Sequence, residues 1–153
     1  MEIKLELSKR FETSAAIDDV FDILADVPRS VSHYPDILSL EDLGDEVYKW
    51  TMQKLGVGGI SHQVVYACRY ASDAAKSEVS WSPIEGVGNG LIEGCWRLST
   101  VAGGTSVDFQ NVGRLQIPVP RILKSAAVPF VEAAFGKQVE TYIAQLCETF
   151  SAL

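Results

Sequence analysis

The fold of this chain is decided by its last third, where residues 128–150 have the sequence VPFVEAAFGKQVETYIAQLCETF. The large apolar residues recur at steps of three and four, which places them on one stripe of a helix: Val128, Val131, Phe135, Val139, Tyr142, Leu146 and Phe150. A neighbouring stripe, with Leu123, Ala127, Phe130 and Ala134, makes the first half of this helix apolar over a wide arc but lines it with small side chains. We predict one long amphipathic helix over 118–153, with a kink or break near 126–129 because Pro129 removes a backbone donor.

Composition limits both the architecture and the class of partner. A chain of 153 residues with 47% hydrophobic residues is expected to form one domain over 1–153, burying roughly 70% of the surface that its unfolded form exposes. The net charge of -7 argues against nucleic acid and against an anionic membrane surface, because both attract basic proteins. No apolar run reaches the roughly 20 residues of a membrane span, and residues 1–10 do not resemble a signal peptide. We therefore expect a cytoplasmic protein with no stable membrane insertion, in which Cys68, Cys95 and Cys147 are thiols.

The first part of the chain predicts a strand followed by a short helix. Apolar and polar residues alternate from Ile3 to Glu12, with only Lys9 out of step, which is typical of a half-buried strand. Residues 15–25 have apolar residues at helical spacing, with Ser14 as a candidate N-cap and two aspartates in the first turn. Residues 26–36 contain two prolines and predict a broken connection or a single helical turn. We expect Val31–Leu38 to form a mobile rim over an opening, because such a segment has few hydrogen bonds to hold it.

From Ile37 to Ile117 the apolar period changes from 3.6 to 2, with glycine-rich breaks at hairpin intervals. The predicted strands are 37–43, 46–55, 60–72, 76–84, 90–102 and 105–117. The turns between them are expected at Gly44-Asp45, Gly56–Gly59, Ser72–Ala75, Gly86–Gly90 and Gly103-Gly104. Together with the first strand this is an α+β fold, in which a curved seven-stranded antiparallel sheet wraps round the long C-terminal helix.

Strand parity predicts which side chains face that helix. The inward set is rich in aromatic residues: Tyr48, Trp50, Met52, Val64, Tyr66, Cys68, Tyr70, Val79, Trp81, Trp96, Leu98, Val107 and Phe109. Two polar residues, His62 and Asn111, share the inward parity, and a buried polar group is costly unless it is satisfied. They are either polar contacts in a pocket or residues at strand ends that bond to backbone or water. Arg69 and Arg97 fall on the outer parity.

The order of elements and four short motifs resemble the START-like (SRPBCC) helix-grip superfamily. The motifs are Tyr34-Pro35 after the first helix, Gly94-Cys95-Trp96-Arg97-Leu98, Gly104-Thr105-Ser106-Val107, and Pro118-Val119-Pro120 before the C-terminal helix. Within the superfamily the chain looks most like the polyketide cyclase/dehydrase and coenzyme-Q-binding (lipid-transport) group. The resemblance implies a deep apolar pocket between the sheet and the long helix, which relatives use for lipids, sterols, quinones, hormones or polyketides.

Catalytic and metal-binding motifs are not found in the sequence. Two histidines and three scattered cysteines do not occur at metal-ligand spacing, so we expect no metal and no cofactor. There is no GxSxG nucleophile elbow, and no gate, latch or iron–sulfur ligand set from other branches of the superfamily. The glycine-rich stretches 56–59 and 86–90 precede strands and are interpreted as turns, not as phosphate loops. The acidic cluster of Glu41, Asp42, Asp45 and Glu46 is interpreted as a solvated turn.

The inward residues of the sheet are large and aromatic, whereas the helix opposite them carries small residues: Ala126, Ala127, Ala133, Ala134 and Gly136. This difference in size suggests a cavity for a hydrophobic small molecule such as a quinone, polyketide or lipid. Close packing of helix on sheet is the competing structural interpretation. The leading hypothesis is a carrier or binding protein; a polyketide cyclase or aromatase that uses His62, Tyr66 and Asn111 as acid–base and orienting groups is the alternative. A protein-interaction module is the third, and the oligomeric state is left open. The predicted ligand-binding residues are Tyr34, Trp50, Met52, His62, Val64, Tyr66, Trp81, Trp96, Leu98, Phe109, Asn111, Ala127, Phe130, Val131 and Ala134.

Overall fold

The computed structural model describes residues 1–57 and 60–153 and has a strand, two short helices, a run of strands and a long helix, in that order. The elements are β1 (Glu2–Thr13), α1 (Ile17–Ala25), α2 (Val27–Val31), β2 (Ile37–Gly44), β3 (Val47–Met52), β4 (Leu55–Val57), β5 (Ile60–His62), β6 (Val65–Asp73), β7 (Glu78–Pro83), β8 (Gly90–Val101), β9 (Gly104–Gln116), the 3₁₀ helix η1 (Arg121–Leu123) and α3 (Lys124–Ser151). The α+β class and the long C-terminal helix are confirmed.

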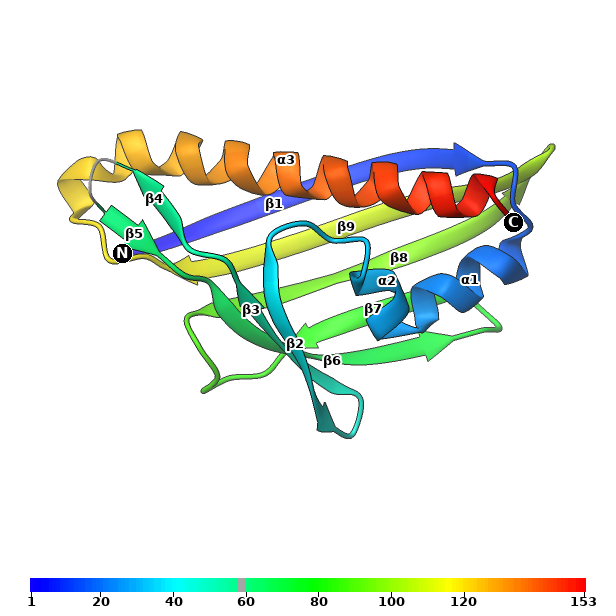
Figure 1. Ribbon diagram of the computed structural model, residues 1–153, viewed down its shortest axis with the longest axis horizontal. Coiled ribbons are helices and arrows are strands. Elements are labelled where there is room, and N and C mark those ends of the chain that lie inside the picture. The colour runs from blue at the N-terminus through cyan, green and yellow to red at the C-terminus, as the bar shows by residue number, and fades with distance from the viewer. Residues whose placement is uncertain (58–59) are drawn as a thin grey trace.

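Seven of the strands form one antiparallel sheet, as predicted, and their order in it is β1-β9-β8-β7-β6-β3-β2. Figure 1 shows α3 running across this curved sheet, with β4 and β5 beside its N-terminal half and α1 and α2 near its C-terminal end. The first strand pairs with the last, so the N-terminus lies close to the segment that leads into α3. The sheet therefore forms one wall of the interior and α3 forms the other.

Two predicted strands are wrong in extent. The stretch 46–55 ends as a sheet strand at Met52, and 60–72 divides into β5 and β6, so that β4 and β5 form a separate two-stranded sheet. At this division the Asn89 side chain accepts a hydrogen bond from Val65 N at 2.9 Å and donates to Gln63 O at 2.8 Å. A loop side chain thus takes the place of a strand partner where the sheet ladder stops.

Three of the predicted turns are displaced by one or two residues. Gly44 and Ser72 lie in strands, and the turns there are Asp45-Glu46 and Ala74–Ser77. The last hairpin turns at Ala102 and Gly103 instead of Gly103-Gly104, and Gly103 has a positive φ of 82°. Gly104 begins β9, where a Cβ would lie 1.9 Å from Thr13 O, so this position requires glycine because of the close approach of β1. In the predicted turn Gly56–Gly59, Gly58 and Gly59 lie outside the described residues.

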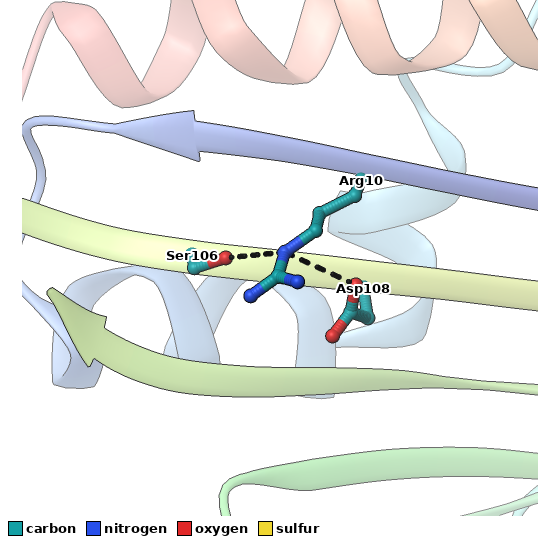
Figure 2. A network of polar contacts seen from close by, with 3 residues as sticks. All are labelled: Arg10, Ser106 and Asp108. Carbon is teal, nitrogen blue, oxygen red and sulfur yellow. Dashed lines mark hydrogen bonds and ion pairs between the residues drawn. The ribbon is translucent and has the colours of Figure 1, made fainter.

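The outer face of the sheet is polar. On β1 and β9, Arg10 Nε donates to Ser106 Oγ at 3.2 Å and lies 3.5 Å from Asp108 Oδ1 (Figure 2). Arg97 on β8 makes a matching contact with Glu78 on β7 at 3.0 Å. These exposed ion pairs contribute little stability, but their position shows that the predicted outer parity is correct on these strands.

The short helices begin differently from the prediction. The N-cap of α1 is Ala16, and its side chain makes no capping hydrogen bond, so the predicted cap at Ser14 is wrong. The two aspartates in the first turn, Asp18 and Asp19, are confirmed and favour the helix through its dipole. The predicted single turn is α2, which Asp26 caps by accepting a hydrogen bond from Arg29 N at 3.2 Å.

The long helix α3 packs on the sheet with only one half of its length. Its buried residues are all in the C-terminal half: Gln138, Val139, Tyr142, Leu146 and Phe150. The N-terminal half has none, although the same apolar stripe continues through it. The helix begins at Lys124, later than the predicted 118, and is continuous through Pro129, so of the kink or break predicted near 126–129 the break is wrong. The helix is held at one end, and the other end faces a less closely packed interior.

Candidate functional site

Three adjoining cavities occupy the space between the sheet and α3. The inner cavity has a volume of about 40 Å³ and lies by the packed half of the helix. The outer cavity has about 190 Å³ and lies by the N-terminal half. The middle cavity, about 40 Å³, shares Tyr34, Tyr66 and Phe135 with the inner cavity and Val64 and Leu115 with the outer one. The cavities therefore follow one another along the helix.

The inner cavity is lined mainly by aromatic rings from the sheet. Trp50 and Tyr66 stack with ring centroids 5.3 Å apart, and Trp96 lies 4.7 Å from Phe109 in a tilted arrangement. Tyr142 of α3 completes the enclosure against Trp96 at 5.7 Å. Desolvation by burial raises the pKa of Tyr66 and Tyr142 well above the ordinary value, so both hydroxyls stay neutral donors.

Polar groups in the inner cavity are largely engaged with one another. Trp81 Nε1 donates to Asn111 Oδ1 at 2.9 Å, and the Ser30 and Tyr142 hydroxyls are hydrogen-bonded. Asn111 is buried in the middle of β9 and not at a strand end, and its Oδ1 atom accepts from a side chain. The Tyr66 hydroxyl and the Asn111 amide nitrogen form no hydrogen bond within 1–57 and 60–153. These two groups are therefore available to a bound molecule.

The segment Val31–Leu38 is attached to α3. His33 Nε2 lies 2.7 Å from Thr149 Oγ1, and the Tyr34 hydroxyl donates to Gln138 Oε1 at 3.2 Å. The expectation that few hydrogen bonds hold this segment is therefore wrong, because side chains that were assigned to a free rim reach across to the helix. The segment covers the inner and middle cavities through Tyr34.

The outer cavity is almost entirely apolar, with His62 as its single titratable side chain among the described residues. His62 belongs to β5 and not to the main sheet, so the parity assumed for it does not apply. Its Nε2 atom is buried and has no hydrogen-bond partner among residues 1–57 and 60–153, and desolvation lowers the pKa of His62 from its ordinary value of 6.5. A neutral imidazole with an unpaired nitrogen thus lies against apolar side chains.

The structure distributes the predicted site residues over the three cavities. The inner cavity has Tyr34, Trp50, Tyr66, Trp81, Trp96, Phe109 and Asn111; the middle has Tyr34, Met52, Val64, Tyr66, Val131 and Ala134; the outer has His62, Val64, Ala127, Phe130 and Val131. Leu98 is buried but lines none of the three. The candidate acid–base groups do not converge, because His62 lies in a different cavity from Tyr66 and Asn111.

Several lining residues were not predicted, and some could have been. Leu115 lines two cavities and continues the inward parity of Phe109 and Asn111, while Phe135 and Tyr142 lie on the predicted apolar stripe of the helix. Leu55 has no such signal, because the position of β4 and β5 depends on tertiary contacts.

No aspartate, glutamate, lysine or arginine lines any of the three cavities within the described part of the chain. In the same residues there is no cluster of three or more histidine, cysteine, aspartate or glutamate side chains that could hold a metal ion. None of the described helices is sufficiently long and apolar to span a bilayer. A charged group placed in these cavities would lose its hydration without gaining a charged partner from their described lining.

Comparison with known proteins gives matches in structure alone. No protein-family model matches the sequence, and a sequence search of curated proteins finds no match. A protein from Thermus thermophilus is 18% identical, with a TM-score of 0.75 over 98% of each chain. The Zhui aromatase/cyclase from Streptomyces sp. R1128 is 14% identical, with a TM-score of 0.67 over 97% of this chain and 94% of that one. A START superfamily protein from Mycobacterium smegmatis is 15% identical, with a TM-score of 0.64 over 96% of this chain and 97% of that one.

This chain has the START-like helix-grip fold, as the sequence resemblance implied. The likeness at these identities concerns the fold, and the ligand has to be argued from the residues of this chain.

We expect Gly94→Ala to disturb the inner cavity. A Cβ at this position would lie 2.2 Å from Gln110 O, 2.7 Å from Trp81 Cζ2 and 2.8 Å from Asn111 Oδ1, so the alanine overpacks the sheet. Urea denaturation followed by tryptophan fluorescence should show a loss of about 1–3 kcal/mol in the free energy of unfolding. Gly136→Ala, in open space on α3, is the control and should raise it by up to about 1 kcal/mol. Equal effects of the two changes would contradict this account.

The unpaired His62 makes stability depend on pH. Its pKa is lower in the folded protein than in the unfolded chain, so its contribution is complete above the ordinary value of 6.5 and is lost as the pH falls below it. When the pH is lowered from about 7.5 to 5.5, we expect the free energy of unfolding to fall less in His62→Gln than in the parent. Urea titrations at both pH values measure the difference. An identical loss in both proteins would show that His62 is not responsible.

Proposed function

We propose that this protein binds an uncharged hydrophobic small molecule between the sheet and α3, as a carrier or binding protein. The observation that carries the proposal is the sequence of three cavities along the helix, with no formally charged side chain among their described lining residues. A molecule of the lipid, quinone or polyketide type would bury its apolar surface against the walls of these cavities. Burial of apolar surface stabilises a complex by about 25 cal/mol per Å².

The three cavities differ in what they offer a ligand. The outer cavity provides apolar contact from Ala127, Phe130 and Val131, whereas the inner one provides aromatic faces and the free hydrogen-bonding capacity of Tyr66 and Asn111. An elongated ligand with an apolar part in the outer cavity and a neutral oxygen at the inner end fits this distribution. Cavities of this kind, apolar with a few converging polar groups, are typical of small-molecule sites.

A cyclase or aromatase is the second candidate, favoured by Tyr66 and Asn111 in the inner cavity and by the aromatase/cyclase among the structural relatives. General acid–base catalysis needs a proton acceptor within hydrogen-bond reach of the reacting atoms. The described lining of the inner cavity has neutral hydroxyls and an amide for this role, and His62 is not among its residues. Binding without turnover is therefore the function that the geometry supports best.

The decisive variant is Ala127→Trp, which fills the outer cavity. If this space is open to a ligand, the indole gains apolar burial there and excludes other molecules, so we expect Nile red fluorescence enhancement to be lost and thermal stability to be unchanged or higher. In a closely packed interior the same insertion would lower stability by about 1–3 kcal/mol. Probe fluorescence and the melting temperature measure the two effects on one sample.

Ala133→Trp is the matched control, because Ala133 is exposed on the same helix and lines none of the three cavities. It should retain probe binding and a melting temperature close to the parent. The proposal fails if the parent does not bind the probe and Ala127→Trp is destabilised, since the space would then be a packed core. Native mass spectrometry of protein purified from its source would show whether a hydrophobic molecule accompanies it.

A further inference from the structure

Exposed apolar side chains gather where the outer cavity opens. Among the described residues six large hydrophobic side chains are exposed, and three of them lie together on η1 and the first turns of α3: Ile122 at 86%, Leu123 at 44% and Phe130 at 42%. Leu123 and Phe130 also line the outer cavity, whereas Ile122 is not part of that lining. Single exposed hydrophobic residues are ordinary, but a cluster at a cavity mouth indicates an interaction surface.

The charge around this mouth is opposite in sign to that of the whole protein. The chain has 20 acidic residues and a net charge of -7, yet residues 53–64 and 117–131 contain no acidic residue and carry Lys54, Arg121 and Lys124. Both segments line the outer cavity through Leu55 and Leu123. The next acidic residue on the helix, Glu132, lies in the groove beside β1. Apolar side chains and cations are thus combined at one end of an otherwise acidic molecule.

We infer that the mouth surface, defined as Lys54, Arg121, Ile122, Lys124 and Phe130, docks on an anionic membrane leaflet. The inference rests on the proposed function, because the leaflet is then the source or the destination of the ligand in the outer cavity. Ile122 and Phe130 enter the boundary between headgroups and acyl chains, and the three cations meet lipid phosphates at headgroup level. Peripheral docking of this kind requires apolar burial together with basic residues, and both are present here.

Charge favours a membrane over a second copy of the chain. Two mouth surfaces facing each other would bring the same three cations together, and like charges across an interface oppose association. The net charge of -7 does not prevent docking in one orientation, because ionic screening limits repulsion from distant acidic residues to about 8 Å at physiological salt. The docked protein therefore presents this end alone to the leaflet.

Vesicle flotation tests the inference. The parent should float with phosphatidylcholine vesicles that contain about 30 mol% phosphatidylglycerol, and bind vesicles of phosphatidylcholine alone at least about tenfold more weakly. Ile122→Ser and the double variant Arg121→Glu/Lys124→Glu should each lose about tenfold or more in binding to the anionic vesicles. Neither change alters a residue that lines the outer cavity, so Nile red binding in vesicle-free solution should remain. Loss of vesicle binding with probe binding intact thus separates docking from the proposed function.

Matched controls lie elsewhere on the surface. Leu38→Ser removes another apolar side chain, 64% exposed on β2, and Arg69→Glu/Lys76→Glu reverses two exposed charges on and after β6. Both should bind vesicles within about twofold of the parent. The inference is overturned if the parent does not float with anionic vesicles, if the controls lose as much binding as the mouth variants, or if Ile122→Ser converts a dimer to a monomer in light scattering.

Discussion

The structure depends on how α3 is packed along its length. One half of the helix packs against the sheet and the α1–α2 region through the large side chains of Val139, Tyr142, Leu146 and Phe150. The other half leaves space between helix and sheet, where it carries Ala127, Phe130 and Ala134. If both halves carried large buried side chains, the interior would be a filled core. If neither did, the helix would have too little burial to be held on the sheet. The site is thus a consequence of an uneven distribution of side-chain volume on one helix.

This gradient in volume is accompanied by a gradient in polarity. Near the packed half of α3, tyrosine, tryptophan and asparagine side chains satisfy most of one another's hydrogen bonds. Near the free half the walls are almost entirely apolar. Neutral polar groups at the closed end can orient a ligand, whereas the apolar walls supply affinity without orientation. The combination suits binding and release of an uncharged molecule better than chemistry on it.

Much of the fold was predictable because it depends on local periodicity. The 3.6 period of the C-terminal third and the alternation in the strands correctly predicted the class, the seven-stranded sheet and most inward-facing residues. The separation of β5 from β6 was not predictable, since the Asn89 side chain that bonds to Val65 and Gln63 there comes from the loop between β7 and β8, and the alternation within 60–72 gives no sign of it. For the same reason the predicted meeting of His62 with Tyr66 and Asn111 does not occur. Alternation along a segment predicts a face only while the segment remains one strand.

The pairing of β1 with β9 has a consequence for how the protein folds. Twelve residues of β1 find their partners about a hundred positions later in the chain, so the sheet has contacts of high sequence separation and slow folding is expected. During synthesis β1 emerges long before β9 and waits without a partner, as an apolar segment able to pair with other chains. Its alternating charged residues, Lys4, Glu6, Arg10 and Glu12, oppose such pairing in the same way that charges protect exposed strand edges. The strand that begins the chain thus carries its own protection against aggregation on the ribosome.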